Sequence, residues 1–143
     1  AVRFFRRTGE GVYDMADLAQ RTEAMAAFVA AHKAQHPGAP VYGFGYSNGA
    51  NILASVMMAR PDLFDRVGLL HPLIPWAPDP VALRGRRVLI TAGQRDPICP
   101  WAMSERLITW ASAQGAEVTT VIHPGGHELR QEELSALAGF LQD

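Results

Sequence analysis

The sequence predicts an α/β fold in which about four parallel strands form one sheet with helices on both faces. Short apolar runs without period-two alternation recur along the chain, and segments of helical periodicity separate them. Strands that are apolar on both faces and are connected through helices are typical of a parallel sheet. The length of 143 residues, 48% of them hydrophobic, fits a single domain over 1–143 with its own core.

Local signals bound each expected element. Apolar residues recur at helical spacing between residues 18 and 29, and Pro37 and Gly38 end that pattern. Pro61 ends the second helical segment, and four prolines between residues 72 and 80 predict an irregular loop. The expected elements are a helix over about 17–36, a strand over 41–46, a helix to about 59, strands over 67–70 and 88–92, a helix over about 100–114, a strand over 118–122 and a helix over about 129–141.

Composition narrows the classes of function. The net charge of −1 argues against a nucleic acid or an anionic membrane surface as the main partner. No apolar run approaches the roughly 18 residues of a membrane span. Cys99 is the single cysteine, which excludes an internal disulfide and favours a reducing compartment, so we expect a cytoplasmic location.

The pentapeptide Gly45-Tyr46-Ser47-Asn48-Gly49 carries the strongest functional signal. It lies between a strand-like apolar run and a helix-like run, the setting in which G-x-S-x-G forms a nucleophile elbow. Such a turn holds a serine hydroxyl at the carboxyl edge of a sheet, and its glycines allow the helix to approach the strand closely. Ser47 is therefore the candidate nucleophile, and the alternative is an ordinary helix N-cap.

Asp96 and His127 follow Ser47 along the chain in the order found in α/β-hydrolases. All three residues come just after predicted strands, so their side chains can converge at one edge of the sheet. A serine hydroxyl is a weak nucleophile and needs an imidazole to take its proton. We therefore expect His127 to act as the general base and Asp96 to orient it. The alternative for Asp96 is a cap on the helix that follows it.

His123 is a rival for the base and a potential metal ligand. It ends a strand immediately before Pro124, so we expect its side chain to point elsewhere. His123 and His127 are four residues apart, but Pro124 and two glycines break any helix between them. Position 131 is glutamine, so the H-E-x-x-H motif fails as well. No metal and no cofactor are expected.

Four other residues are candidates for the substrate pocket. His71 enters the proline-rich loop from the end of a strand, and packing in the interior is the first interpretation of it, a pocket wall the second. Trp76, Trp101 and Met103 are interpreted as core or as the lining of an apolar pocket for an acyl group.

Four stretches of the chain together resemble the phospholipase/carboxylesterase branch of the α/β-hydrolases. They are Arg3-Phe4-Phe5-Arg6-Arg7, Glu10-Gly11-Val12-Tyr13-Asp14, Gly43-Phe44-Gly45-Tyr46-Ser47-Asn48-Gly49-Ala50-Asn51 and Gly125-Gly126-His127-Glu128-Leu129. The resemblance implies Ser47 as nucleophile, His127 as base and acid, and Asp96 as the orienting group. It also implies a small-molecule ester as substrate, with carboxylesterase or lysophospholipase-like activity. In this fold the backbone N–H of Asn48 donates to the oxyanion hole.

Family members carry further strands, and a loop that supplies part of the oxyanion hole, ahead of the stretch that matches residues 1–14. A truncated, catalytically weak or silent module acting in binding or assembly is therefore the alternative function. The strand over 41–46 would then be an open sheet edge, which we expect a homodimer or an N-terminal segment to cover. Helix 129–141 would leave apolar side chains partly exposed, namely Leu134, Leu137, Phe140 and Leu141.

Overall fold

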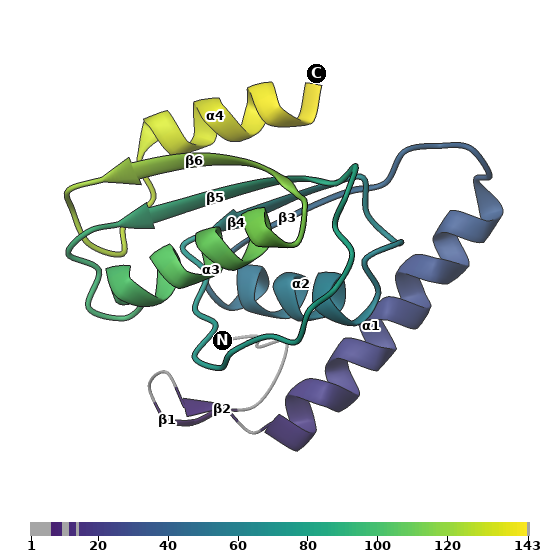
Figure 1. Ribbon diagram of the computed structural model, residues 1–143, viewed down its shortest axis with the longest axis horizontal. Coiled ribbons are helices and arrows are strands. Elements are labelled where there is room, and N and C mark those ends of the chain that lie inside the picture. The colour runs from purple at the N-terminus through teal and green to yellow at the C-terminus, as the bar shows by residue number, and fades with distance from the viewer. Residues whose placement is uncertain (1–6, 10–11, 14, 143) are drawn as a thin grey trace.

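The computed structural model describes residues 7–9, 12–13 and 15–142 and shows the predicted α/β architecture (Figure 1). Four parallel strands form a sheet in the order β3-β4-β5-β6. They are β3 (Tyr42–Tyr46), β4 (Arg66–Leu70), β5 (Arg87–Gly93) and β6 (Glu117–His123). Residues 1–6, 10, 11 and 14, on which part of the family resemblance depends, lie outside the described residues.

Helices cover both faces of this sheet (Figure 1). The helix α4 packs on one face, α2 and α3 pack on the other, and α1 packs against α2. Their bounds are α1 (Met15–Gln35), α2 (Asn48–Ala59), α3 (Trp101–Ala113) and α4 (Gln131–Gln142). A short antiparallel pair precedes α1, formed by β1 (Arg7–Gly9) and β2 (Val12–Tyr13), which the sequence pattern did not predict.

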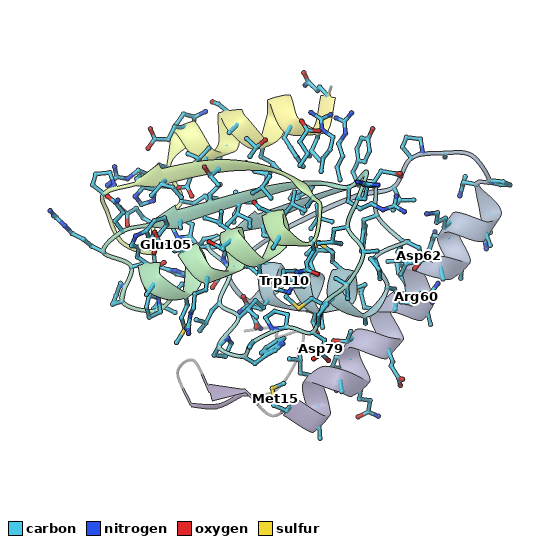
Figure 2. All side chains as sticks on the ribbon, viewed as in Figure 1. Met15, Arg60, Asp62, Asp79, Glu105 and Trp110 are labelled. Atoms are coloured by element: carbon cyan, nitrogen blue, oxygen red, sulfur yellow. The ribbon has the colours of Figure 1, made fainter. Side chains whose placement is uncertain are left out.

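The inner strands are apolar on both faces, as the sequence predicts. Val67 and Val88 pack into the larger cluster, toward α2, whereas Leu70 and Leu89 pack with residues of α4. Side chains fill the space between the sheet and its helices (Figure 2). Just after α2, Arg60 and Asp62 form an ion pair on the protein surface. Among the described residues, no helix combines the length and apolar character that a membrane crossing requires.

The exposure expected along the last helix is partly wrong. Leu137 and Phe140 are buried, because they pack on Leu70 and Leu89 of the sheet. Leu134 is 43% exposed, as expected, and Leu141 is half-buried. The stripe that faces the sheet also contains Glu133, which is fully buried.

Candidate active site

Ser47 occupies a strained turn between β3 and α2. Its φ of 56° and ψ of −115° lie in a region that non-glycine residues rarely adopt, and its side chain makes no capping hydrogen bond. Ser47 thus precedes α2 at the N-cap position but is not an ordinary cap, and the geometry is that of a nucleophile elbow. A Cβ on Gly45 would lie 2.6 Å from the carbonyl carbon of Gly49, which confirms the close approach of helix and strand.

The three predicted side chains meet at the carboxyl ends of their strands. Ser47 Oγ lies 2.9 Å from Nε2 of His127, and Nδ1 of His127 lies 2.7 Å from Oδ2 of Asp96. The His127 side chain is 18% exposed, whereas the Asp96 carboxylate is fully buried. The ring is thus open to a reactant on one side and fixed by a buried anion on the other.

Both oxygens of Asp96 accept hydrogen bonds. Oδ1 accepts the backbone N–H groups of Ile98 and Cys99 at 2.8 and 2.9 Å, and Oδ2 faces His71 as well as His127. Burial raises the pKa of Asp96, but the hydrogen bonds from Cys99 and the two imidazoles outweigh burial, so the pKa lies below its ordinary value. Asp96 therefore holds the turn ahead of α3 and faces His127 at the same time. The N-cap of α3 is Pro100 and no side chain caps this helix, so the alternative of a helix cap is wrong.

Backbone contacts fix the loop of Asp96 against the loop of His127. The N–H of Arg95 donates to the carbonyl of Gly125 at 2.9 Å, and the N–H of Gln94 donates to the carbonyl of His123 at 2.8 Å. A Cβ on Gly93 would lie 2.6 Å from the Gly125 oxygen, so glycine is required there.

Tyr46 is a site residue that the sequence analysis missed. Its phenol donates a hydrogen bond to the backbone carbonyl of His127, and the two rings lie 5.3 Å apart. Burial, followed by the negative charges of Asp96 and Glu133, raises the pKa of Tyr46, so the phenol remains a neutral donor. Tyr46 stands next to Ser47 in the elbow and so ties the nucleophile turn to the histidine loop.

His71 lies in the interior, which agrees with the first interpretation of this residue. Its side chain is fully buried, with Nδ1 3.0 Å from Asp96 Oδ2 and Nε2 2.7 Å from Glu133 Oε1. Nε2 of His123 lies 3.3 Å from Glu133 Oε2. Glu133 was also missed, although its position on the apolar stripe of α4 is a signal that the sequence contains.

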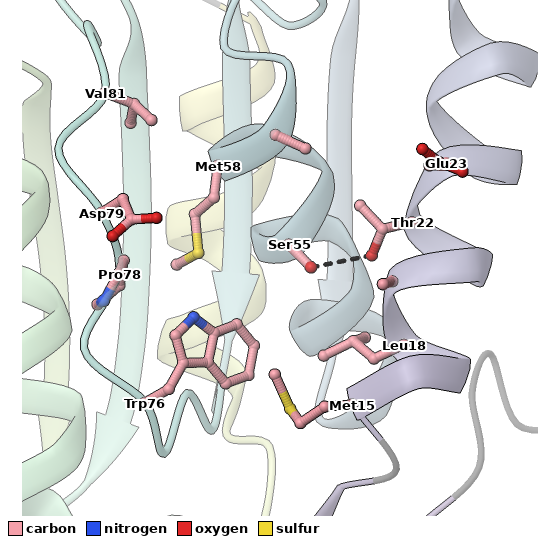
Figure 3. A pocket seen from close by; sticks show the side chains of 12 residues that line it. Met15, Leu18, Thr22, Glu23, Ser55, Met58, Trp76, Pro78, Asp79 and Val81 are labelled. Carbon is pink, nitrogen blue, oxygen red and sulfur yellow. Dashed lines mark hydrogen bonds between the residues drawn. The ribbon is translucent and has the colours of Figure 1, made fainter.

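The three remaining pocket candidates do not form one surface. Trp76 and Met103 line a common cavity of about 210 Å³. Trp76 also borders a groove of about 390 Å³ between α1, α2 and the proline-rich loop, where Thr22 donates to Ser55 at 2.9 Å (Figure 3). Trp101 begins α3, is half-buried and lines neither space.

Two groups of described residues bring potential metal ligands together. They are His71, Asp96 and His127, and His71, His123 and Glu133. Within them, however, hydrogen-bond partners are only 2.7 Å apart, as for His127 Nδ1 and Asp96 Oδ2. Two atoms bound tetrahedrally to zinc at about 2.0–2.1 Å lie more than about 3 Å apart. These atoms are therefore arranged for direct hydrogen bonds, and His123 and His127 share neither group.

Asn48 is the first residue of α2. The first amides of a helix have no carbonyl partner within it, and the helix dipole places partial positive charge there. A backbone hydrogen bond at the start of α2 runs from the N–H of Asn51 to the carbonyl of Ser47, at 3.0 Å. No carbonyl within α2 can therefore accept the N–H of Asn48, which is the predicted oxyanion donor.

Known proteins align with most of this chain. MhqD of Bacillus subtilis (strain 168), a protein that carries the name of a hydrolase, is 39% identical over 137 residues, which cover 92% of this chain and 67% of MhqD. The protein Atu2452 of Agrobacterium tumefaciens, of unknown function, is 55% identical with a TM-score of 0.92, over 97% of this chain and 69% of that one. A Bacillus cereus carboxylesterase is 35% identical with a TM-score of 0.87, over 98% and 68%. No family model matches the sequence.

Proposed function

Because this chain belongs to the phospholipase/carboxylesterase branch of the α/β-hydrolase superfamily, we propose that it is a serine hydrolase of small to medium carboxylic esters. The observation that carries the proposal is the pair of hydrogen bonds that joins Ser47 to His127 and His127 to Asp96. The name of the Bacillus cereus relative supports an ester as the substrate.

Acylation begins when Ser47 Oγ attacks the carbonyl carbon of the ester and its proton passes to Nε2 of His127. The carbonyl oxygen becomes an oxyanion, which the N–H of Asn48 stabilises. The imidazolium is stabilised in turn by Asp96. When the tetrahedral intermediate collapses, the bond to the alcohol breaks, and His127 returns the proton to the departing alkoxide.

Deacylation repeats these steps with water as the nucleophile. His127 takes a proton from water as the water oxygen attacks the acyl carbon, and the acid leaves when Oγ of Ser47 recovers the proton. The cycle needs one titrating imidazole, so activity rises with pH as His127 loses its proton.

The acyl group is the part of the substrate for which the chain offers an apolar surface. Trp76 and Met103 pack beside the cluster of Leu18, Ile52, Leu73 and Cys99. We propose that this surface binds the acyl group. The two candidate activities are those of a carboxylesterase and of a lysophospholipase-like enzyme. A series of p-nitrophenyl esters of increasing acyl length separates them, because only a lysophospholipase-like enzyme prefers long chains.

A fluorophosphonate probe tests the nucleophile. The probe is expected to label Ser47, and labelling is expected to vanish in Ser47→Ala and to fall strongly in His127→Ala. Ser55→Ala is the matched control, because Ser55 lies in α2, the helix that follows Ser47, and accepts a hydrogen bond from Thr22. Labelling that persists in Ser47→Ala and maps to Ser55 or Ser104 contradicts the proposal.

A second candidate function is a weakly active or silent module that acts in assembly. The observation that favours it is the edge position of β3, where Phe44 is 61% exposed. A well-folded chain in which the probe leaves Ser47 unlabelled would favour this candidate.

A further inference from the structure

A row of buried ionisable side chains lies behind Asp96, and the proposed reaction does not use it. His71 follows β4 and lies between Asp96 and Glu133, with 3.0 Å and 2.7 Å from its ring nitrogens to their oxygens. His123, at the end of β6, lies on the other side of Glu133. All four side chains are buried, so their polar atoms need hydrogen-bond partners inside the protein.

The neighbours of His123 determine its tautomer. The N–H of Gly125 donates to Nδ1 of His123 at 3.0 Å, so Nδ1 carries no proton. Nε2 of His123 is therefore the donor, toward Glu133 Oε2 and the carbonyl of Glu128, each at 3.3 Å. Oε2 also accepts the N–H of Arg130 at 2.7 Å. Glu133 thus receives donors as an ionised carboxylate does.

The two ring nitrogens of His71 face one carboxylate each. A neutral imidazole has a single N–H, which would leave a lone pair opposite a carboxylate oxygen in the interior. A proton on both nitrogens makes both contacts charge-assisted hydrogen bonds. Because imidazole is more basic than a carboxylate, the additional proton belongs on His71 rather than on Glu133.

The backbone provides independent support for a special role of His71. Its φ is 52°, a left-handed conformation that non-glycine residues adopt mainly where the surroundings enforce it. The N–H of His71 donates to the carbonyl of Thr91 at 3.0 Å, and its carbonyl accepts the thiol of Cys99 at 3.3 Å. The ring is therefore held in place from its backbone as well as from both nitrogens.

We propose that His71 is a positioning residue that carries a proton on both ring nitrogens and so fixes Asp96 toward His127. This role depends on the proposed serine chemistry. Oδ2 of Asp96 faces both rings, with Nδ1 of His71 at 3.0 Å and Nδ1 of His127 at 2.7 Å. A hydrogen bond from the fixed ring of His71 holds this oxygen where it accepts from His127.

The charged and titratable groups around His71 come from every element packed against it. From the sheet come Tyr46 of β3 and His123 of β6. From the loops come Asp96 and Cys99 after β5, and His127, Glu128 and Arg130 after β6. Glu133 comes from α4. Arg130 pairs with Glu128 at 3.0 Å, in a pair that is open to solvent. With His123 neutral, His71 is the cation that offsets Asp96 and Glu133.

The protonation of His71 is measured without substrate, from ¹H–¹⁵N spectra of the histidine rings in the full chain. From about pH 6 to pH 9, one histidine is expected to carry protons on both ring nitrogens, and its signals are expected to vanish in His71→Asn. Asparagine suits this position because it tolerates the left-handed backbone. A neutral His71 ring at pH 7 would overturn the proposal.

The kinetic consequence is tested with the same variant on a p-nitrophenyl ester. In His71→Asn, kcat is expected to fall with KM nearly unchanged, because Asp96 then orients His127 less well. His36→Asn is the matched control, because it removes an exposed imidazole just after α1. A rise in KM as large as the fall in kcat would indicate a general loss of structure and would contradict the proposal, as would an unchanged kcat.

Glu133→Gln keeps the inference testable if His71→Asn does not fold. Without the anion, the His71 ring is expected to lose one proton within the same pH range, whereas Glu132→Gln, an exposed neighbour, changes nothing. An unchanged doubly protonated ring in Glu133→Gln overturns the proposal. If the imidazolium is present but the probe does not label Ser47, the serine chemistry fails and the protonation of His71 stands.

Discussion

The two oxygens of Asp96 have different partners, so an amide at this position has one favourable orientation. Two backbone N–H groups hold Oδ1, and an asparagine would keep its oxygen there. Its NH₂ group would then face Nδ1 of His127, which would have to become an acceptor. The proton of His127 would move to Nε2, and the ring would no longer be able to accept the proton of Ser47.

Asp96→Asn is therefore expected to lower kcat by about ten-thousandfold while the fold is retained. Kinetics on a p-nitrophenyl ester and far-UV circular dichroism measure the two effects. Turnover near that of the native chain would assign the orienting role to another residue.

The depressed pKa of Asp96 also predicts how stability changes in acid. The folded chain holds the carboxylate ionised more strongly than the unfolded chain does. Asp96 thus stabilises the fold above its ordinary pKa of about 4, and this contribution is lost as the pH falls through the folded value. Urea unfolding between about pH 5 and pH 2 is expected to show a weaker pH dependence in Asp96→Asn than in the native chain.

At the scale of elements, the contact between β3 and α2 depends on Gly45. A Cβ there would lie within 2.6–2.9 Å of backbone atoms of Gly49 and Ala50, which cannot move without shifting the elbow. Gly45→Ala is expected to lower the free energy of unfolding by roughly 1–3 kcal/mol and to reduce labelling of Ser47.

Gly139 in α4 offers a control at a glycine that no neighbour approaches. No atom lies within 4 Å of a Cβ built there, so Gly139→Ala is expected to stabilise α4 by up to about 1 kcal/mol. Urea unfolding measures both variants. Equal effects of the two substitutions would show that the loss of a glycine as such, rather than the close approach at Gly45, determines the result.

The helices and strands also show how much of the fold the sequence predicts. Periodicity and the placement of prolines and glycines predicted α1 to α4 and β3 to β6, because those signals are local. The burial of Leu137 and Phe140 was not predicted, since it depends on which strands α4 covers. The short β1 and β2 carry too few residues for a pattern.

Some residues of the candidate site can be predicted from the sequence and others cannot. Ser47, Asp96 and His127 follow from strand ends and chain order, whereas His71 and Glu133 meet only through the packing of α4 on the sheet. No local pattern contains that contact. Tyr46 was missed for a similar reason, because its partner lies 81 residues away.

At the scale of the whole molecule, β3 is an outer strand of the described sheet. Phe44 is 61% exposed and Tyr42 38% exposed along it. Apolar strands with unpaired backbone groups associate readily. We therefore expect a second copy of the chain, or a segment that precedes β3, to pair with this edge in solution.

Hydrogen exchange and light scattering together test that expectation. A covered edge slows exchange at all five amides of Tyr42–Tyr46, whereas an open edge slows only those that bond to β4. A scattering mass above that of one chain identifies a second copy. A monomer with fast exchange at alternate amides of β3 would show that the edge is open.

Ser47 and His127 follow the two outer strands of the described sheet, β3 and β6, so their 2.9 Å hydrogen bond spans the ends of β4 and β5. Outer strands are the first parts of a sheet to open locally, and the buried inner pair can persist when they do. The contact between Ser47 and His127 therefore has its own, smaller free energy of opening. We expect heat or denaturant to separate these two residues while most of the core is still folded.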